Sequence, residues 1–207
     1  MIDRFEVVRL TAQHAAIVSA AVGLGVVVGV PLGVAMTRRR RLVPFVQTCT
    51  TALQTMPSMA LLGLLLLAPG VGGLGAKPAI TALFLYSLLA IVENTYVGIR
   101  QVDPAIVVAG RGLGMTDAQV LRWIELPQAL PVIVAGVRIA TVASIGTATI
   151  ASYIGAGGLG DLIFRGVSRG DPAAVAWGAV PAIAMSLAAY LLLGAVERRL
   201  SRRSKPR

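Results

Sequence analysis

Long apolar runs broken by short polar intervals set the pattern of this sequence. A run of about 18 or more apolar residues with few charges is typical of a membrane-spanning helix. About five such runs occur, so the pattern predicts an all-α integral membrane protein with a single transmembrane domain over residues 1–207. The predicted spans cover residues 15–36, 43–68, 78–97, 132–154 and 172–196.

The longest interval with polar residues, 98–131, lies between the third and fourth predicted spans. Asp103 followed by Pro104 is a favourable pair of N-cap and first helical residue. Thr116 opens the pattern of a capping box, which predicts a second helix that ends near Pro127. Glycines between the two helices permit a turn. The interval is therefore predicted to form a helical hairpin outside the membrane.

Two of the predicted spans, 43–68 and 132–154, are rich in hydroxyl and amide side chains. Polar side chains at membrane depth normally face the protein interior or a water-filled path. Pro57 predicts a break in the second span, and broken helices often line transport sites. The alternative is that these hydroxyls bond to their own helix and serve only in packing. The candidate residues of a substrate pathway are Gln54, Thr55, Ser58, Ser144 and Thr147.

Small and charged residues inside the spans predict specific contacts. Gly25, Gly29 and Gly33 recur every four residues in the first span and predict a smooth face for close helix packing. Glu93 is the only acidic residue within a predicted span. It is expected to pair with an arginine near the cytoplasmic interface, and a proton-relay role is the alternative.

The composition excludes a soluble domain and sets an orientation. The chain is 56% hydrophobic and 14% charged, which leaves too little polar surface to cover a soluble core. The net charge of +10 is explained by membrane orientation rather than nucleic-acid binding, because Lys and Arg are retained on the cytoplasmic side. Most basic residues, including Arg38–Arg41 and the tail 197–207, fall on one side. The N-terminus is therefore expected outside, and the C-terminus and the 98–131 hairpin in the cytoplasm.

No set of residues for catalysis or metal binding stands out. The chain has one histidine, His14, and one cysteine, Cys49, and its acidic residues are widely spread. Residues 70–75 and 155–160 both fit G-x-G-x-x-G, but that fingerprint binds dinucleotides only between a strand and a helix. Both are expected to be tight turns of outer loops. We therefore expect no catalytic residue and no metal or cofactor bound by this chain.

The 98–131 hairpin resembles the EAA loop of importer-type ABC permeases, in which E-A-A is followed by a glycine and then by I-x-L-P. Val108 stands where that family has Glu, and Gly110 where it usually has Ala. The resemblance implies that apolar faces of the hairpin, including Val108, Val120 and Ile124, dock in a groove of a cytoplasmic ATPase. The residues at the matching positions are Val108, Ala109, Gly110, Gly114, Ile124, Leu126 and Pro127.

Three further stretches, 54–66, 82–105 and 154–166, resemble the permeases of osmoprotectant importers, which carry glycine betaine, choline, carnitine and similar quaternary amines. Ala90 and Glu93 stand where that family has Pro and Arg. The resemblance implies the fold of a type I ABC importer permease in the inner membrane of a prokaryote. It also implies a second permease subunit, the same or related, cytoplasmic ATPase subunits that use ATP and Mg, and an external or periplasmic binding protein.

Three other functions stay open from the sequence. The same architecture could import methionine or another amino acid. An ion-driven secondary transporter would favour several intramembrane acids, whereas a non-transporting scaffold would not need broken helices rich in hydroxyls.

Overall fold

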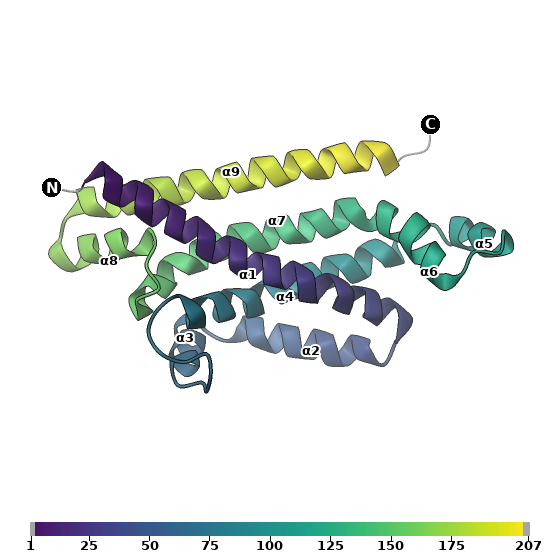
Figure 1. Ribbon diagram of the computed structural model, residues 1–207, viewed down its shortest axis with the longest axis horizontal. Coiled ribbons are helices and arrows are strands. Elements are labelled where there is room, and N and C mark those ends of the chain that lie inside the picture. The colour runs from purple at the N-terminus through teal and green to yellow at the C-terminus, as the bar shows by residue number, and fades with distance from the viewer. Residues whose placement is uncertain (1–2, 205–207) are drawn as a thin grey trace.

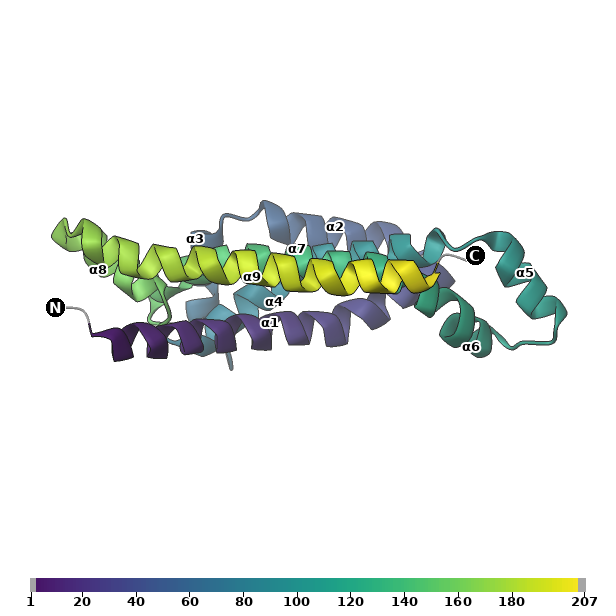
Figure 2. The same cartoon turned by 90° about the horizontal axis from the view of Figure 1, so that it is seen from above.

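The computed structural model describes residues 3–204, which form an elongated helical bundle with no strand among them (Figure 1 and Figure 2). Within this part of the chain, four helices are long and apolar enough to cross a membrane. They are α1 (Arg4–Arg38), α4 (Ala76–Arg100), a continuous helix over Asp117–Ile154, and α9 (Pro172–Ser204). The predicted all-α fold is confirmed.

The second predicted span is broken, as expected from Pro57. α2 (Leu42–Thr55) and α3 (Ser58–Leu66) meet at an angle of 97° and together make a fifth candidate span. Proline disfavours the α conformation of the residue before it, and Met56 is extended, with φ −68° and ψ 131°. The Tyr86 hydroxyl donates a hydrogen bond to the Met56 carbonyl oxygen at 2.8 Å and so satisfies a carbonyl at the break.

Gly25, Gly29 and Gly33 bring α1 and α4 into close contact, as their spacing predicted. A Cβ atom on Gly33 would lie 2.6 Å from the Thr95 Cβ and 2.8 Å from the Val92 carbonyl oxygen. Side-chain atoms do not approach each other this closely, so a larger residue would force the two helices apart. The glycine face is therefore confirmed as a packing surface.

The hairpin differs from its prediction in the second helix. α5 (Pro104–Gly112) and α6 (Asp117–Val120) are both present. However, α6 continues without a break through a π-helical turn, η1 (Leu121–Glu125), into α7 (Leu126–Ala151). We refer to α5, α6 and η1 together as the hairpin. The expected end of the second helix near Pro127 is wrong.

Pro127 does not end the helix because a π turn precedes it. The Leu126 N–H bonds to the carbonyl oxygen of Leu121, five residues back. Pro127 is the second residue of α7, so its missing N–H falls where the π turn already interrupts the regular hydrogen bonds of the helix. The fourth long helix therefore begins well before residue 132, where the hydrophobic pattern predicts its start.

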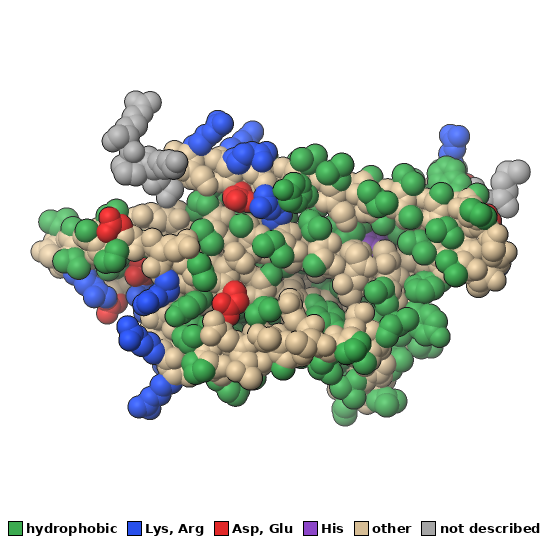
Figure 3. Space-filling model, turned by 180° about the vertical axis from the view of Figure 1, so that it is seen from behind, with side chains coloured by type: hydrophobic (Ala, Val, Ile, Leu, Met, Phe, Trp, Pro, Cys, Tyr) green, Lys and Arg blue, Asp and Glu red, His purple; other side chains and the backbone are tan. Residues whose placement is uncertain are grey.

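The two ends of the bundle carry different elements (Figure 1). The hairpin and the C-terminal end of α9 lie at one end, and α8 (Gly160–Arg169) lies at the other with the start of α1. Residues 205–207 of the predicted basic tail 197–207 lie outside the described residues. Figure 3 shows hydrophobic side chains spread over the flank and basic side chains, which are arginines, gathered toward the hairpin end.

Both glycine-rich loops form tight turns, as predicted. Each contains several glycines with positive φ, as a turn of this kind requires. The Gly75 N–H donates a hydrogen bond to the Ile154 carbonyl oxygen at 3.0 Å, so the first loop is anchored beside the second.

Candidate functional site

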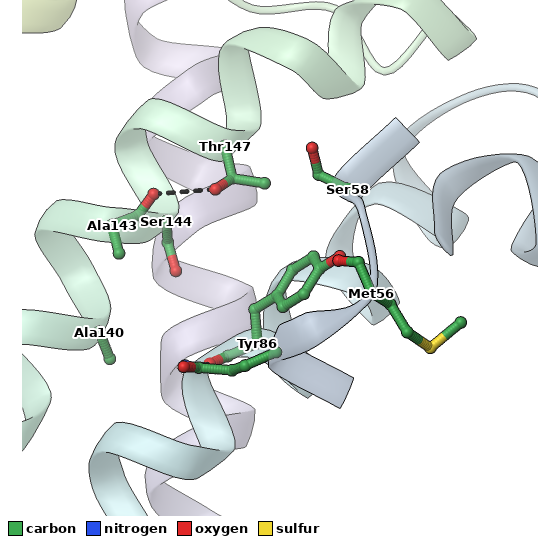
Figure 4. Close-up of a pocket in the computed structure, with 8 residues that line it drawn as sticks. Met56, Ser58, Tyr86, Ala140, Ala143, Ser144 and Thr147 are labelled. Carbon is green, nitrogen blue, oxygen red and sulfur yellow. Dashed lines mark hydrogen bonds between the residues drawn. The ribbon is translucent and has the colours of Figure 1, made fainter. Parts of the chain in front are cut away.

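A polar cavity of about 280 Å³ lies between the α2–α3 break and helices α4 and α7 (Figure 4). We refer to it as the break cavity. α7 contributes one helical face to it, with side chains spaced i, i+3, i+4 and i+7. The lining residues are Gln54, Met56, Ser58, Tyr86, Ala140, Ala143, Ser144 and Thr147.

The structure brings most of the predicted pathway residues together at the break cavity. Those that line it are Gln54, Ser58, Ser144 and Thr147. Thr55 does not line it, and its hydroxyl donates a hydrogen bond to the Ala52 carbonyl oxygen at 2.8 Å within α2. For Thr55 the alternative of bonding to its own helix therefore describes the side chain better.

Sequence reasoning missed the rest of the lining. The Gln54 side-chain amide donates a hydrogen bond to the Tyr86 carbonyl oxygen at 3.2 Å, so the wall of the cavity ties broken α2 to α4. A tyrosine inside a predicted span was an available signal for this wall. Ala140 and Ala143 have no polar side chain that would indicate a place in the lining. Only their helical spacing from Ser144 and Thr147 indicates that they share the same face of α7.

The two α7 hydroxyls at the break cavity differ in their surroundings. Thr147 donates a hydrogen bond to the Ala143 carbonyl oxygen at 3.1 Å, within its own helix. Ser144 is only 3% exposed, yet it lines the cavity from the same face. Figure 4 shows both side chains on α7 across the cavity from Ser58 and Tyr86. Polar groups from four helices, α2, α3, α4 and α7, thus surround a space that a small polar solute can occupy.

A second hollow of about 600 Å³ adjoins the break cavity, because Gln54 lines both. Glu93 lies in this hollow, which we call the Glu93 groove, and accepts a hydrogen bond from the Gln47 amide at 3.2 Å. The expected pairing of Glu93 with an arginine is therefore wrong. The groove is lined by Gln47, Thr51, Gln54, Leu89, Ala90, Glu93 and Ile139.

Arg38 forms an ion pair with Glu125 that ties the end of α1 to the π turn. Arg38 Nη1 donates to Glu125 Oε1 at 3.2 Å, and Arg38 Nη2 donates to Glu125 Oε2. Glu125 is only 6% exposed, and a carboxylate this buried needs a charged or hydrogen-bonding partner. The two residues are 87 positions apart, so no local pattern of the sequence predicts the pair.

The turn of the hairpin is built on Gly114, which closes α5 in a Schellman motif. Gly114 has φ +84°, and its N–H bonds to the Arg111 carbonyl oxygen at 2.9 Å. The Met115 N–H bonds to the Gly110 carbonyl oxygen at 3.2 Å. Gly110 is buried, and a Cβ atom there would lie 2.6 Å from Ile124 Cδ1. Both glycines are thus explained by local geometry.

The predicted coupling residues differ in exposure. Val108, Ala109 and Pro127 are exposed, whereas Ile124 and Leu126 are half-buried. Val108, where the related loop has a carboxylate, therefore presents an apolar side chain on the outside of the hairpin.

The apolar surface of the hairpin includes residues that sequence reasoning did not select. Leu113 is 85% exposed and Trp123 is 62% exposed, and Ile106 also lies at the surface. Val120 is fully buried, so its expected part in docking is wrong. Large exposed apolar side chains at the end of a polytopic bundle are typical of a surface that binds another protein.

The opposite end of the bundle carries charged side chains. Arg165 of α8 contacts Glu6 of α1 at 2.6 Å, which ties the two elements together. Burial raises the pKa of Asp161, and the neighbouring Arg165 and Arg9 oppose that rise. This end therefore presents ionic groups that link α8 to α1.

An all-helical bundle with a broken span, a polar cavity beside the break and an apolar hairpin at one end defines a polytopic membrane permease. The chain belongs to the family of binding-protein-dependent transport system inner membrane components, whose model matches residues 23–205. The resemblance to importer-type permeases is confirmed, and the protein is a multi-pass inner-membrane protein.

Several relatives match nearly the whole chain. It is 44% identical to the carnitine transport permease protein OpuCB of Listeria monocytogenes, over 92% of this chain and 86% of the relative. It is 44% identical to the choline transport system permease protein OpuBB of Bacillus subtilis, over 95% of this chain and 89% of the relative. It is 51% identical to the osmoprotectant import permease protein OsmW of Salmonella typhimurium, over 78% of this chain and 76% of the relative.

The fold is similar to solved importer structures. A chain of the inward-facing MetNI methionine ABC transporter aligns with a TM-score of 0.86, at 21% identity, over 96% of this chain and 99% of that chain. This likeness confirms the predicted fold of an ABC importer permease.

Proposed function

We propose that this protein is the membrane-spanning subunit of an ATP-driven importer for a small osmoprotectant such as glycine betaine, choline or carnitine. The observation that carries the proposal is the 44% identity to permeases named for carnitine and choline transport, over 92% and 95% of the chain. The chain itself is not an enzyme in this proposal. ATP and Mg are used by partner ATPase subunits.

The substrate pathway in this proposal passes through the break cavity. Gln54, Ser58, Ser144 and Thr147 supply neutral polar groups at a helix break, where backbone and side chains can contact a solute at membrane depth. Four neutral polar residues orient a small solute without holding it tightly, which suits a site that must also release it.

The hairpin is the proposed contact with the ATPase subunits. Val108 and Ala109 lie on its surface, and Trp123 adds a large exposed side chain nearby. Pro127 is exposed just beyond the hairpin, at the start of α7. An apolar helical element fits a groove on a partner protein. ATP-driven closure of the ATPase pair would then move the spans between inward-open and outward-open states.

The whole chain acts as one transmembrane domain in this proposal, with the N-terminus outside and the C-terminus cytoplasmic. The concentration of Arg at the hairpin end supports this orientation. The α8 end would then face the external or periplasmic binding protein. A second permease subunit, the same or a related chain, completes the pathway.

Reconstitution of the complex tests this function. The permease is purified from native membranes with the ATPase and binding protein that accompany it, and placed in proteoliposomes. Glycine betaine, choline or carnitine should stimulate ATP hydrolysis and accumulate inside. Stimulation by methionine or other amino acids alone, or uptake that persists when the ATP site of the partner is disabled, would overturn the proposal.

A further inference from the structure

Glu93 gives the Glu93 groove a negative charge. The other polar side chains of the lining are the neutral Gln47, Thr51 and Gln54. The hydrogen bond from Gln47 is donated by an amide, which orients the carboxylate without cancelling its charge. The salt bridges among the side chains that the structure describes do not include Glu93. Glu93 therefore leaves an uncompensated negative charge facing an open hollow.

The position of this charge in α4 makes a purely structural role a poor explanation. Glu93 lies seven residues before Arg100, the last residue of α4, which places it about 10 Å from the end of the helix at 1.5 Å per residue. An acidic side chain inside a predicted membrane span is rare, and without a counter-charge it normally marks an ion or substrate path. Its hydrogen bond from Gln47 holds it toward α2, on the side of the groove.

The groove is also placed to receive a solute from the break cavity. Gln54 lines both hollows, the break cavity at the α2–α3 break and the groove farther along α2 toward the hairpin end. A solute that leaves the break cavity in that direction therefore meets Glu93 next. Because a hollow lined by one sign of charge concentrates ions of the opposite sign, the groove selects for positive charge.

We propose that Glu93 and Gln47 form a cation-binding station that holds the quaternary ammonium group of the cargo between the break cavity and the hairpin end. This inference rests on the proposed function and adds to it a preference for cargo with net positive charge. The Glu93 carboxylate attracts a cation such as choline and so strengthens its binding in the groove. A zwitterion such as glycine betaine is bound less strongly there, because Glu93 repels the carboxylate of the zwitterion.

The test compares two cargoes in Glu93 variants of the reconstituted complex. Glu93→Gln keeps the size and the hydrogen bond to Gln47 but removes the charge. It should lower choline uptake, as kcat/KM, about tenfold, which corresponds to about 1.4 kcal/mol. Glycine betaine uptake should fall about threefold or less, and Glu93→Asp should retain most choline uptake.

Asp171→Asn is the matched control, because it removes one negative charge from an exposed N-cap outside the groove. Asp171 accepts hydrogen bonds from the N–H groups of Ala173 and Ala174, and asparagine caps helices as well as aspartate. Because Asp171 lies at the end proposed to face the binding protein, any change in uptake should be the same for both cargoes, and the ratio of choline uptake to glycine betaine uptake should match that of the wild type. Equal losses of choline and glycine betaine in Glu93→Gln, or no loss of either, would overturn the proposal.

Failure of the proposed function is distinguishable from failure of this inference. If the wild-type complex imports no quaternary amine, the proposed function is wrong. The cation station is then tested directly by binding of tetramethylammonium to the permease complex in lipid nanodiscs. Binding that weakens about tenfold in Glu93→Gln and not in Asp171→Asn supports the station, and binding that is equal in all three proteins overturns it.

Discussion

Gly114 is the single residue on which the turn of the hairpin depends. Proline fixes φ near −65° and lacks the N–H that bonds to Arg111, whereas Gly114 has φ +84° and uses that N–H. Gly114→Pro should therefore displace α5 from η1 and abolish ligand-stimulated ATP hydrolysis while the protein still inserts. The measurement is ATPase activity of the complex in proteoliposomes with and without ligand.

Gly114→Asn is the control for this change, since asparagine tolerates the left-handed conformation better than other residues with a side chain. It should keep most of the ligand stimulation. Full stimulation in the Gly114→Pro complex would contradict the idea that the hairpin transmits the action of the ATPase.

The packing of α1 on α4 depends on the α1 residues that face α4. Two glycines of α1 provide a test of this packing and its control. At Gly33 a Cβ atom would meet the Val92 carbonyl oxygen, which is backbone and cannot rotate away. At Gly23 a Cβ atom would meet nothing within 4 Å. Gly33→Leu should destabilise the protein by about 1–3 kcal/mol, and Gly23→Leu should change little.

The two glycine variants are compared by thermal unfolding in detergent, followed by the loss of the monomeric or dimeric peak in size-exclusion chromatography. A lower unfolding temperature for Gly33→Leu alone is the expected result. If both variants unfold together with the wild type, the α1–α4 contact is looser than the structure indicates.

The Arg38–Glu125 ion pair links two elements, α1 and the π turn. Removal of Arg38 should lower the stability of the protein, because it leaves a buried charge without a partner. Arg38→Leu strands the Glu125 carboxylate, and should cost about 1–3 kcal/mol because Arg38 itself is partly exposed. Glu125→Gln in the same chain removes the stranded charge and should restore part of the stability. The unfolding temperatures of the two single variants and the double variant measure the coupling. If the stability losses of the two single variants add up in the double variant, the ion pair makes no contribution to stability.

Local patterns predicted the elements of this fold well, and contacts between distant elements only in part. The break lies at Pro57, as predicted, although Pro31, Pro131 and Pro181 lie inside continuous helices. The glycine face of α1 follows from spacing alone. Pro127 has the same chemistry as Pro57 but does not end a helix, because the π turn of the preceding residues accommodates it. The Arg38–Glu125 pair joins positions far apart in sequence and has no local signature.

The candidate site shows the same limit. The hydroxyl-rich spans indicated which helices line a cavity, but not which hydroxyls face it. Thr55 and Ser58 are three residues apart and lie on either side of the α2–α3 break, which turns the chain by 97°. The direction of each side chain therefore depends on the geometry of the break, which the sequence pattern does not specify. Of these two residues, Ser58 lines the break cavity and Thr55 does not.

At the scale of the whole molecule, the proposed transport mechanism requires that the break cavity open to water in one state and close in another. The single cysteine, Cys49, allows a clean probe, because Cys49→Ala leaves a chain without thiols. In that background Ser144→Cys places a thiol in the lining of the break cavity, and Ala148→Cys places one in the hydrophobic core, outside that lining. A small cationic thiol reagent should modify the first thiol and spare the second.

The rate of this modification should also depend on the state of the ATPase subunits and on ligand. When vanadate traps the ATPase pair closed, the reaction of the Ser144→Cys thiol with reagent added from the cytoplasmic side should slow about tenfold or more, since the cavity no longer opens to that side. Bound quaternary amine should slow it as well, because the two compete for one space. The rate is read from the mass of the labelled permease over time in vesicles of known orientation. A rate that is the same in trapped, resting and ligand-bound complexes would show that the break cavity lies off the transport path.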